Sequence, residues 1–107
     1  MPVYVDNMRA RVGRMVMCHM VADTEHELHE MADRIGVDRR WYQYPLKSRH
    51  PHYDIGLGMR ALAVAAGAIE ISQREAPAIT RRCLAAAGRQ PLPRVAGAAH
   101  EQDASVK

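Results

Sequence analysis

Two histidines and an aspartate stand within five residues of one another in the run His50-Pro51-His52-Tyr53-Asp54. In an extended chain, His52 and Asp54 point to the same face because successive side chains alternate. Imidazole nitrogens and carboxylate oxygens are ligands of Zn²⁺, Mn²⁺ and other transition metals. We therefore predict a divalent metal site in which His52 and Asp54 are joined by Asp6 from another strand end, with His19 as a fourth ligand or a proton shuttle.

The chemistry of such a site would be hydrolytic. A bound Zn²⁺ or Mn²⁺ activates water for attack on a phosphate ester, so the enzymatic hypothesis is a metal-dependent hydrolase of phosphate esters. The alternative is structural: His52 and Asp54 pair with each other or with the backbone, Asp54 caps the next helix, and His19 is a satisfied core histidine. No spacing here matches a named metal motif, and both interpretations stay open.

A second candidate site is the segment 39–53, which holds four of the five aromatic residues of the chain and no carboxylate. The segment also carries arginines and a lysine. Such cations contact phosphate oxygens while aromatic rings stack on bases, which favours a nucleic acid or nucleotide ligand. Pro45 and Pro51 break regular structure, so an extended, exposed loop is expected. The predicted ligand contacts are Arg39, Arg40, Trp41, Tyr42, Lys47 and Arg49.

The same loop also suits a partner protein, because Trp, Tyr and Arg are enriched at interface hot spots. The chain would then be a non-enzymatic interaction module, either a homodimer or a phage-type modulator of a host protein. A third interpretation places Trp41 and the tyrosines in the core of an undersized domain. Steep salt dependence is typical of nucleic-acid binding and not of an aromatic protein interface.

The elements that position these residues follow from apolar periodicity. Asp6 follows a short strand, and His19 is the polar member of an apolar run of strand length. Thr24 and Glu27 fit a capping box, and the helix they begin ends at Gly36. The predicted elements are strands over 2–5, 15–21 and 69–71, the helix over 24–36, a buried helix over 57–66, and a last helix from 77 to 88.

This order of elements predicts a small α/β or α+β domain with a short sheet covered by about three helices. The domain is expected over residues 1–88, and residues 89–107, with Pro91, Pro93 and Gly97, read as a flexible tail. If part of the sheet is parallel, Asp6, Asp23 and the loop leading to Asp54 should gather at one rim.

Size and composition limit the remaining choices. A chain of 107 residues supports one domain, and its net charge of +3 is a mild excess. Cys18 and Cys83 lie in apolar runs without zinc spacing, which indicates free thiols in a reducing compartment. The N-terminus has no signal core and no apolar run approaches the roughly 18 residues of a membrane span, so a cytoplasmic protein without membrane partners is expected.

A series of short motifs extends over most of residues 2–76: Tyr4-Val5-Asp6, His19, Ala22-Asp23-Thr24, Glu27-Leu28, Trp41 with Gln43, His52-Tyr53-Asp54, Gly67-Ala68-Ile69-Glu70-Ile71-Ser72 and Arg74-Glu75. In this order they resemble the small bacterial and phage family catalogued as domain of unknown function four thousand and thirty-one. The resemblance implies no assigned activity and no catalytic residues. Asn7 stands where members often carry a second acid, and Ile55-Gly56 where they carry a Thr or Ser helix cap.

Overall fold

The computed structural model of this chain describes residues 2–45 and 47–88; the tail predicted for 89–107 lies outside them. The described residues form a mixed five-stranded sheet with three α-helices, which confirms the predicted α/β class. The strands are β1 (Val3–Val5), β2 (Ala10–Val12), β3 (Met15–Ala22), β4 (Tyr53–Gly56) and β5 (Ile69–Glu70). The helices are α1 (Glu25–Ile35), α2 (Leu57–Ala65) and α3 (Ala76–Ala86), with short 3-10 turns at Arg39–Trp41 and Gln73–Glu75.

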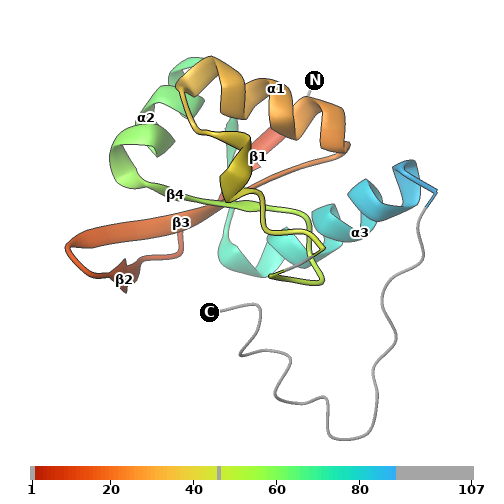
Figure 1. Ribbon diagram of the computed structural model, residues 1–107, viewed down its shortest axis with the longest axis horizontal. Helices are drawn as coiled ribbons and strands as arrows, with labels where there is room; N and C mark the ends of the chain where they lie inside the picture. The colour runs from red at the N-terminus through yellow and green to blue at the C-terminus, as the bar shows by residue number, and fades with distance from the viewer. Residues whose placement is uncertain (1, 46, 89–107) are drawn as a thin grey trace, which may run out of the picture.

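The apolar run predicted as a strand forms β3, and β3 is the centre of the sheet (Figure 1). Along one edge β3 pairs with β1 and β2, and along the other edge it pairs with β4, all antiparallel. The outer strand β5 runs parallel to β1. Strands buried on both faces read as near-continuous apolar runs, which is why β3 contains so few polar residues.

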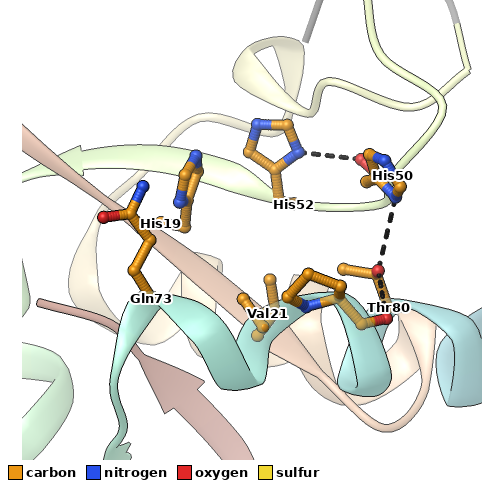
Figure 2. A pocket seen from close by; sticks show the side chains of 8 residues that line it. His19, Val21, His50, His52, Gln73 and Thr80 are labelled. Carbon is orange, nitrogen blue, oxygen red and sulfur yellow. Dashed lines mark hydrogen bonds between the residues drawn. The ribbon is translucent and has the colours of Figure 1, made fainter. Parts of the chain in front are cut away.

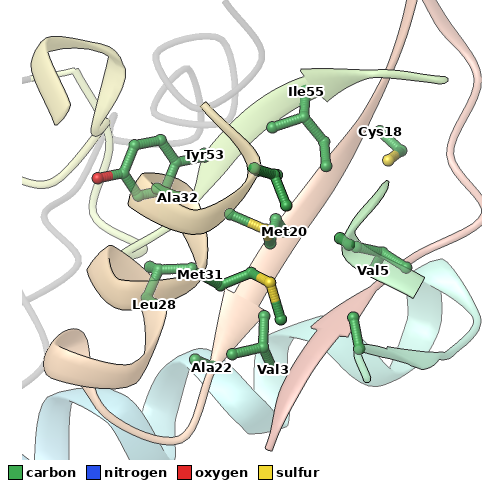
Figure 3. Packing of buried hydrophobic residues seen from close by; sticks show 13 residues of the cluster. Val3, Val5, Cys18, Met20, Ala22, Leu28, Met31, Ala32, Tyr53 and Ile55 are labelled. Atoms are coloured by element: carbon green, nitrogen blue, oxygen red, sulfur yellow. The ribbon is translucent and has the colours of Figure 1, made fainter. Parts of the chain in front are cut away.

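Alternation along β3 divides the core between the two faces of the sheet. Met20 and Ala22 belong to the larger cluster beneath α1 and α2, together with Val5 and Leu28 (Figure 3). Val21, which points the other way, packs with residues of α3. The domain therefore has three layers, with α1 and α2 on one face of the sheet and α3 on the other (Figure 1).

Helix α1 begins and ends where its sequence signals predict. The Thr24 hydroxyl accepts a hydrogen bond from the Glu27 N–H at 3.1 Å and donates to the Glu27 carboxylate at 2.9 Å. Gly36 closes the helix with φ of 85°, a left-handed conformation that glycine adopts without strain. These contacts fix the helix that packs on β3 and β1.

The prediction of a buried helix over 57–66 is wrong in its burial. Among the residues of α2 only Ala63 is buried, and Leu57, Met59 and Leu62 are exposed. The sheet is narrow, so α2 covers it with one stripe that includes Ala63 and the partly buried Val64. Apolar residues on every side of this helix therefore did not mean that every side is buried.

The structure also contains a short strand that is not among the predicted elements, between the first two predicted strands. Residues Ala10–Val12 form β2, which turns back through Gly13 to pair with the start of β3. Gly13 has φ of 60°, as tight hairpin turns between antiparallel strands require.

Candidate metal centre

The register of the sheet brings three polar residues side by side on the face that α3 covers. His19 on β3 lies directly across from Asp54 on β4. On the other edge of β3, Asp6 follows β1 and donates its backbone N–H to the His19 carbonyl at 3.0 Å. His52 precedes Asp54 by two residues and so points to the same face. Three neighbouring strands thus supply one row of side chains.

The side chains of His19, His52 and Asp54 converge. One ligand atom from each lies within 4.8 Å of the other two. The Asp54 Oδ1 atom is 3.8 Å from His19 Nε2 and 3.4 Å from His52 Nε2. The His52 ring is only 5% exposed, and its Nε2 is buried without a hydrogen bond. Since buried polar atoms are nearly always hydrogen-bonded, this nitrogen is expected to have a partner such as water or an ion.

The hydrogen bonds of the two rings fix their tautomers. His19 Nδ1 lies 2.7 Å from Asp6 Oδ2, and His52 Nδ1 lies 2.8 Å from the His50 carbonyl oxygen. A carboxylate and a carbonyl only accept, so each Nδ1 carries the proton. In the neutral rings both Nε2 atoms then hold a lone pair directed at the Asp54 carboxylate, and this is the form that binds metals.

Asp6 is a buried carboxylate that stays ionised. Burial raises the pKa of Asp6, but hydrogen bonds from the ring and backbone of His19, the charge of that ring, and the Met8 N–H together outweigh burial. The pKa of Asp6 therefore lies below its ordinary value. A carboxylate in this state keeps a strong, charge-assisted hydrogen bond to His19.

A pocket of about 240 Å³ adjoins the cluster, between the sheet, the loop before β4 and the start of α3 (Figure 2). Thr80 of α3 donates to the Pro77 carbonyl at 3.0 Å, and its oxygen lies 3.4 Å from His50 Nδ1. The pocket is therefore closed on one side by α3 and on the other by two of the cluster histidines. Its lining residues are His19, Val21, His50, His52, Gln73, Ala76, Pro77 and Thr80.

Of the four residues predicted at the metal site, three come together and one has a different place. Asp6 lies outside the group formed by His19, His52 and Asp54, and it contacts His19 instead. The predicted rim of Asp6, Asp23 and Asp54 is wrong, because β1 and β3 are antiparallel. Asp23 consequently lies beside Pro2, at the opposite end of β1 from Asp6, and pairs with Arg82.

Most rings of the aromatic segment pack inward, against the prediction of an exposed loop. Tyr53 is fully buried, with its hydroxyl 2.7 Å from His29 Nδ1, and Tyr44 is buried as well. Tyr42 donates a hydrogen bond to Glu25 at 2.6 Å. These rings complete the contact between the loop and α1, as the third interpretation of the segment expected for the tyrosines.

The cations of the segment have mixed environments. Arg39 pairs with Asp33 of α1 at 2.9 Å, and Arg49 is half-buried. Trp41 is 49% exposed, with the Arg40 guanidinium 5.0 Å and the Lys47 ammonium 5.9 Å from its ring. We call these three residues, Arg40, Trp41 and Lys47, the Trp41 platform. None of them lines the pocket beside the cluster.

The wall that α3 gives the pocket was not expected from the sequence. Ala76, Pro77 and Thr80 are ordinary residues of a helix start, and nothing in their spacing indicates a ligand site. Only the packing of α3 on Val21 brings them to within reach of His50 and His52.

The fold and the site define a small mixed α/β domain with a cluster of two histidines and one carboxylate on one face of its sheet. The chain belongs to the family described as Protein of unknown function (DUF4031), which it matches over residues 3–83. This confirms the resemblance drawn from the motifs, and the matched range includes the whole cluster. No curated protein and no solved structure matches the chain. In the part that the structure describes, every helix is too short or too polar to cross a membrane.

Proposed function

We propose that this domain binds a divalent transition metal through His19, His52 and Asp54 and hydrolyses a phosphate ester in the adjoining pocket. The observation that carries the proposal is the buried Nε2 of His52, which makes no hydrogen bond although a carboxylate oxygen lies 3.4 Å away. His52 Nε2 and Asp54 Oδ1 approach each other without a hydrogen bond, and His19 Nε2 lies beside them. Three ligands of one metal ion would be arranged in this way.

The ligand set favours Zn²⁺ or Mn²⁺. Two imidazole nitrogens and a carboxylate are the ligands of many hydrolytic zinc sites, and a related set holds other first-row metals. Three protein ligands leave coordination positions for water and substrate. A metal held there would act as a Lewis acid and lower the pKa of a water molecule.

The surroundings of the pocket favour an anionic substrate. Partial desolvation first, and then the charges of His52, Arg49, His19 and Arg81, keep the pKa of His50 below its ordinary value. Of these groups the two arginines are always charged, and they raise the concentration of anions near the pocket mouth. A phosphate ester combines negative charge with a bond that a metal-activated water can cleave, which is why we choose this class.

Metal binding is tested on untagged protein by elemental analysis and by titration with Zn²⁺ and Mn²⁺. We expect stoichiometric metal in the wild type. Loss of a residue that hydrogen-bonds to a metal ligand lowers metal affinity roughly 10- to 100-fold, and we expect His52→Ala, which removes a ligand itself, to lower it by at least as much. The matched control is His26→Ala, because His26 lies on α1 with its side chain 81% exposed. A wild type without metal affinity, or two variants that bind alike, would contradict the proposal.

Hydrolysis is tested with p-nitrophenyl phosphate and bis(p-nitrophenyl) phosphate on metal-free and metal-loaded protein. We expect turnover that needs the metal in the wild type and in His26→Ala and is lost in His52→Ala. Metal binding without turnover of either ester would remove the hydrolytic half of the proposal.

A second candidate function rests on the Trp41 platform. A half-exposed indole with two cations near its ring suits a stacked base with its phosphates, as in a nucleic acid or nucleotide. The same group of residues is typical of protein interface hot spots, so a protein partner or a homodimer is the competing assignment.

Trp41 is the only tryptophan of the chain, so its fluorescence reports on the platform directly. We expect oligodeoxythymidylate to quench it at low salt, with affinity that falls steeply as salt rises. Arg40→Ala should weaken this binding, and Arg34→Ala, which removes an exposed arginine from α1, should not. Absence of quenching at low salt, with self-association that salt leaves unchanged, would favour the protein interface instead.

A further inference from the structure

We infer that Asp6 is a positioning residue for the metal centre, whose carboxylate holds His19 in the tautomer that can bind a metal. This inference rests on the proposed function for its biological meaning. The locking itself depends only on the contacts of Asp6, and it is testable in metal-free protein.

Every polar group of Asp6 is engaged, and the residue is 0% exposed. Its N–H donates to the His19 carbonyl at 3.0 Å, and its carbonyl accepts from Arg60 Nε at 3.0 Å. Its Oδ1 accepts from the backbone N–H groups of His19 at 2.9 Å and Met8 at 3.2 Å. Only Oδ2 remains for the His19 ring, at 2.7 Å from Nδ1. The carboxylate is therefore fixed in orientation before the ring contacts it.

The fixed carboxylate leaves the His19 ring a single arrangement. Oδ2 accepts hydrogen bonds and donates none, so Nδ1 must carry the proton and Nε2 must carry the lone pair. Metal-binding histidines commonly donate their second nitrogen to a carboxylate, which fixes the ring and raises the basicity of the ligand. Here the carboxylate belongs to the residue that follows β1 and the ring to β3, so the pairing of these two strands aligns the carboxylate with the ring.

By fixing the tautomer of His19, Asp6 also prevents a hydrogen bond between two of the proposed metal ligands. His19 Nε2 lies 3.8 Å from Asp54 Oδ1. In the opposite tautomer this nitrogen would carry a proton and could donate it to Asp54 in a hydrogen bond after a small shift. Such a bond would occupy both atoms and close the site to a cation. Asp6 prevents it by holding the only proton of the neutral ring on the other side.

Replacing Asp6 by asparagine should invert the tautomer with little change of shape. The two backbone N–H groups at Oδ1 cannot become acceptors, so the amide oxygen has to face them. The amide NH₂ then faces the His19 ring, whose Nδ1 must accept and whose Nε2 must take the proton. The reverse amide orientation would place a donor against two buried donors.

The test measures ring tautomers by long-range nitrogen–proton NMR correlations in metal-free protein, and metal affinity by titration with Zn²⁺. We expect the Nδ1–H form of His19 in the wild type and the Nε2–H form in Asp6→Asn, with metal binding weakened about 10- to 100-fold. The matched control is Asp23→Asn, whose carboxylate pairs with Arg82 at the other end of β1. This control should keep both the tautomer and the affinity of the wild type.

Three results would overturn the inference: a wild-type ring protonated at Nε2, an Asp6→Asn ring that keeps the wild-type tautomer, or an inverted ring that binds metal as the wild type does. The first needs no variant and decides the matter even where Asp6→Asn does not fold. A wild type that binds no metal but shows the expected pair of tautomers would refute the metal centre and leave the lock intact. The two proposals therefore fail separately.

Discussion

The two imidazoles of the cluster differ in what holds them. His19 donates to the carboxylate of Asp6, and His52 donates to a backbone carbonyl. A hydrogen bond to a charged acceptor is stronger than one to a neutral carbonyl, so the His19 ring is held in its orientation more firmly than the His52 ring. Side-chain substitution can remove only the first of these partners, which makes Asp6 the residue through which the site is best tested.

Asp6 also gives the unfolding free energy a pH dependence at the acid end. Burial raises the pKa of Asp6, but the contacts with His19 and Met8 lower it by more, so the pKa lies below the reference value of 3.8. A depressed folded pKa stabilises the protein above the unfolded pKa, and this stability is lost as the pH falls through the folded pKa. We expect urea unfolding to show a smaller loss of stability on acidification in Asp6→Asn than in the wild type.

The difference in stability between the wild type and Asp6→Asn reports on the titration of Asp6 alone. Asp33, whose pKa is lowered mainly by its hydrogen bond from Arg39, titrates in both proteins and cancels in the difference. Parallel stability curves over the acid range would show that Asp6 has the same pKa in the folded and unfolded chain, contrary to its contacts.

Among the elements, α1 and β4 are joined by a hydrogen bond at the back of the candidate site. Tyr53 points from β4 to α1, where its hydroxyl meets His29. Burial raises the pKa of Tyr53 to about 12, so the hydroxyl keeps its proton at neutral pH. Its neighbours on the strand, His52 and Asp54, point to the opposite face. The position of α1 thus supports the strand that carries Asp54 and directly follows His52.

The capping box of α1 gives a test at this scale. Thr24→Ala removes the acceptor of the Glu27 N–H and the donor to the buried Glu27 carboxylate. We expect the unfolding free energy to fall by about 1 kcal/mol, as is typical for a lost N-cap. For a domain of this size such a loss lowers the melting temperature by about 4–8 °C.

The control for the cap is Thr24→Ser, which keeps the hydroxyl and should melt close to the wild type. Calorimetry of the three proteins separates the cap from the methyl group. Equal melting temperatures for Thr24→Ala and the wild type would mean that water replaces the hydroxyl at this helix end without cost.

At the scale of the whole molecule, the site exists because one face of the sheet is only partly covered. Helices α1 and α2 cover the face that carries Met20 and Tyr53. On the other face α3 packs over Val21 and stops short of His19, which is half-buried. The pocket lies at this border between covered and open sheet (Figure 2). Polar residues at His19 and Asp54 are tolerated there because the face is open to a ligand or to water.

Local signals in the sequence were sufficient for the elements and for part of the site. The capping box with Gly36 predicts α1, and the apolar run predicts β3, because these features act within one turn or one strand. Alternation alone places His52 and Asp54 on the same face. The family is one of unknown function, so the resemblance adds membership and no mechanism.

Strand pairing decided the rest, since it joins residues far apart in the chain. The antiparallel order of β1, β3 and β4 brings Asp6 to His19 and His19 to Asp54, and it sends Asp23 to the far end of the sheet. The tyrosines turn inward because α1 offers buried partners that no local pattern reveals. The sequence by itself determined which residues could bind a metal, and the tertiary structure decided which of them meet, because register is a property of paired strands and not of any one segment.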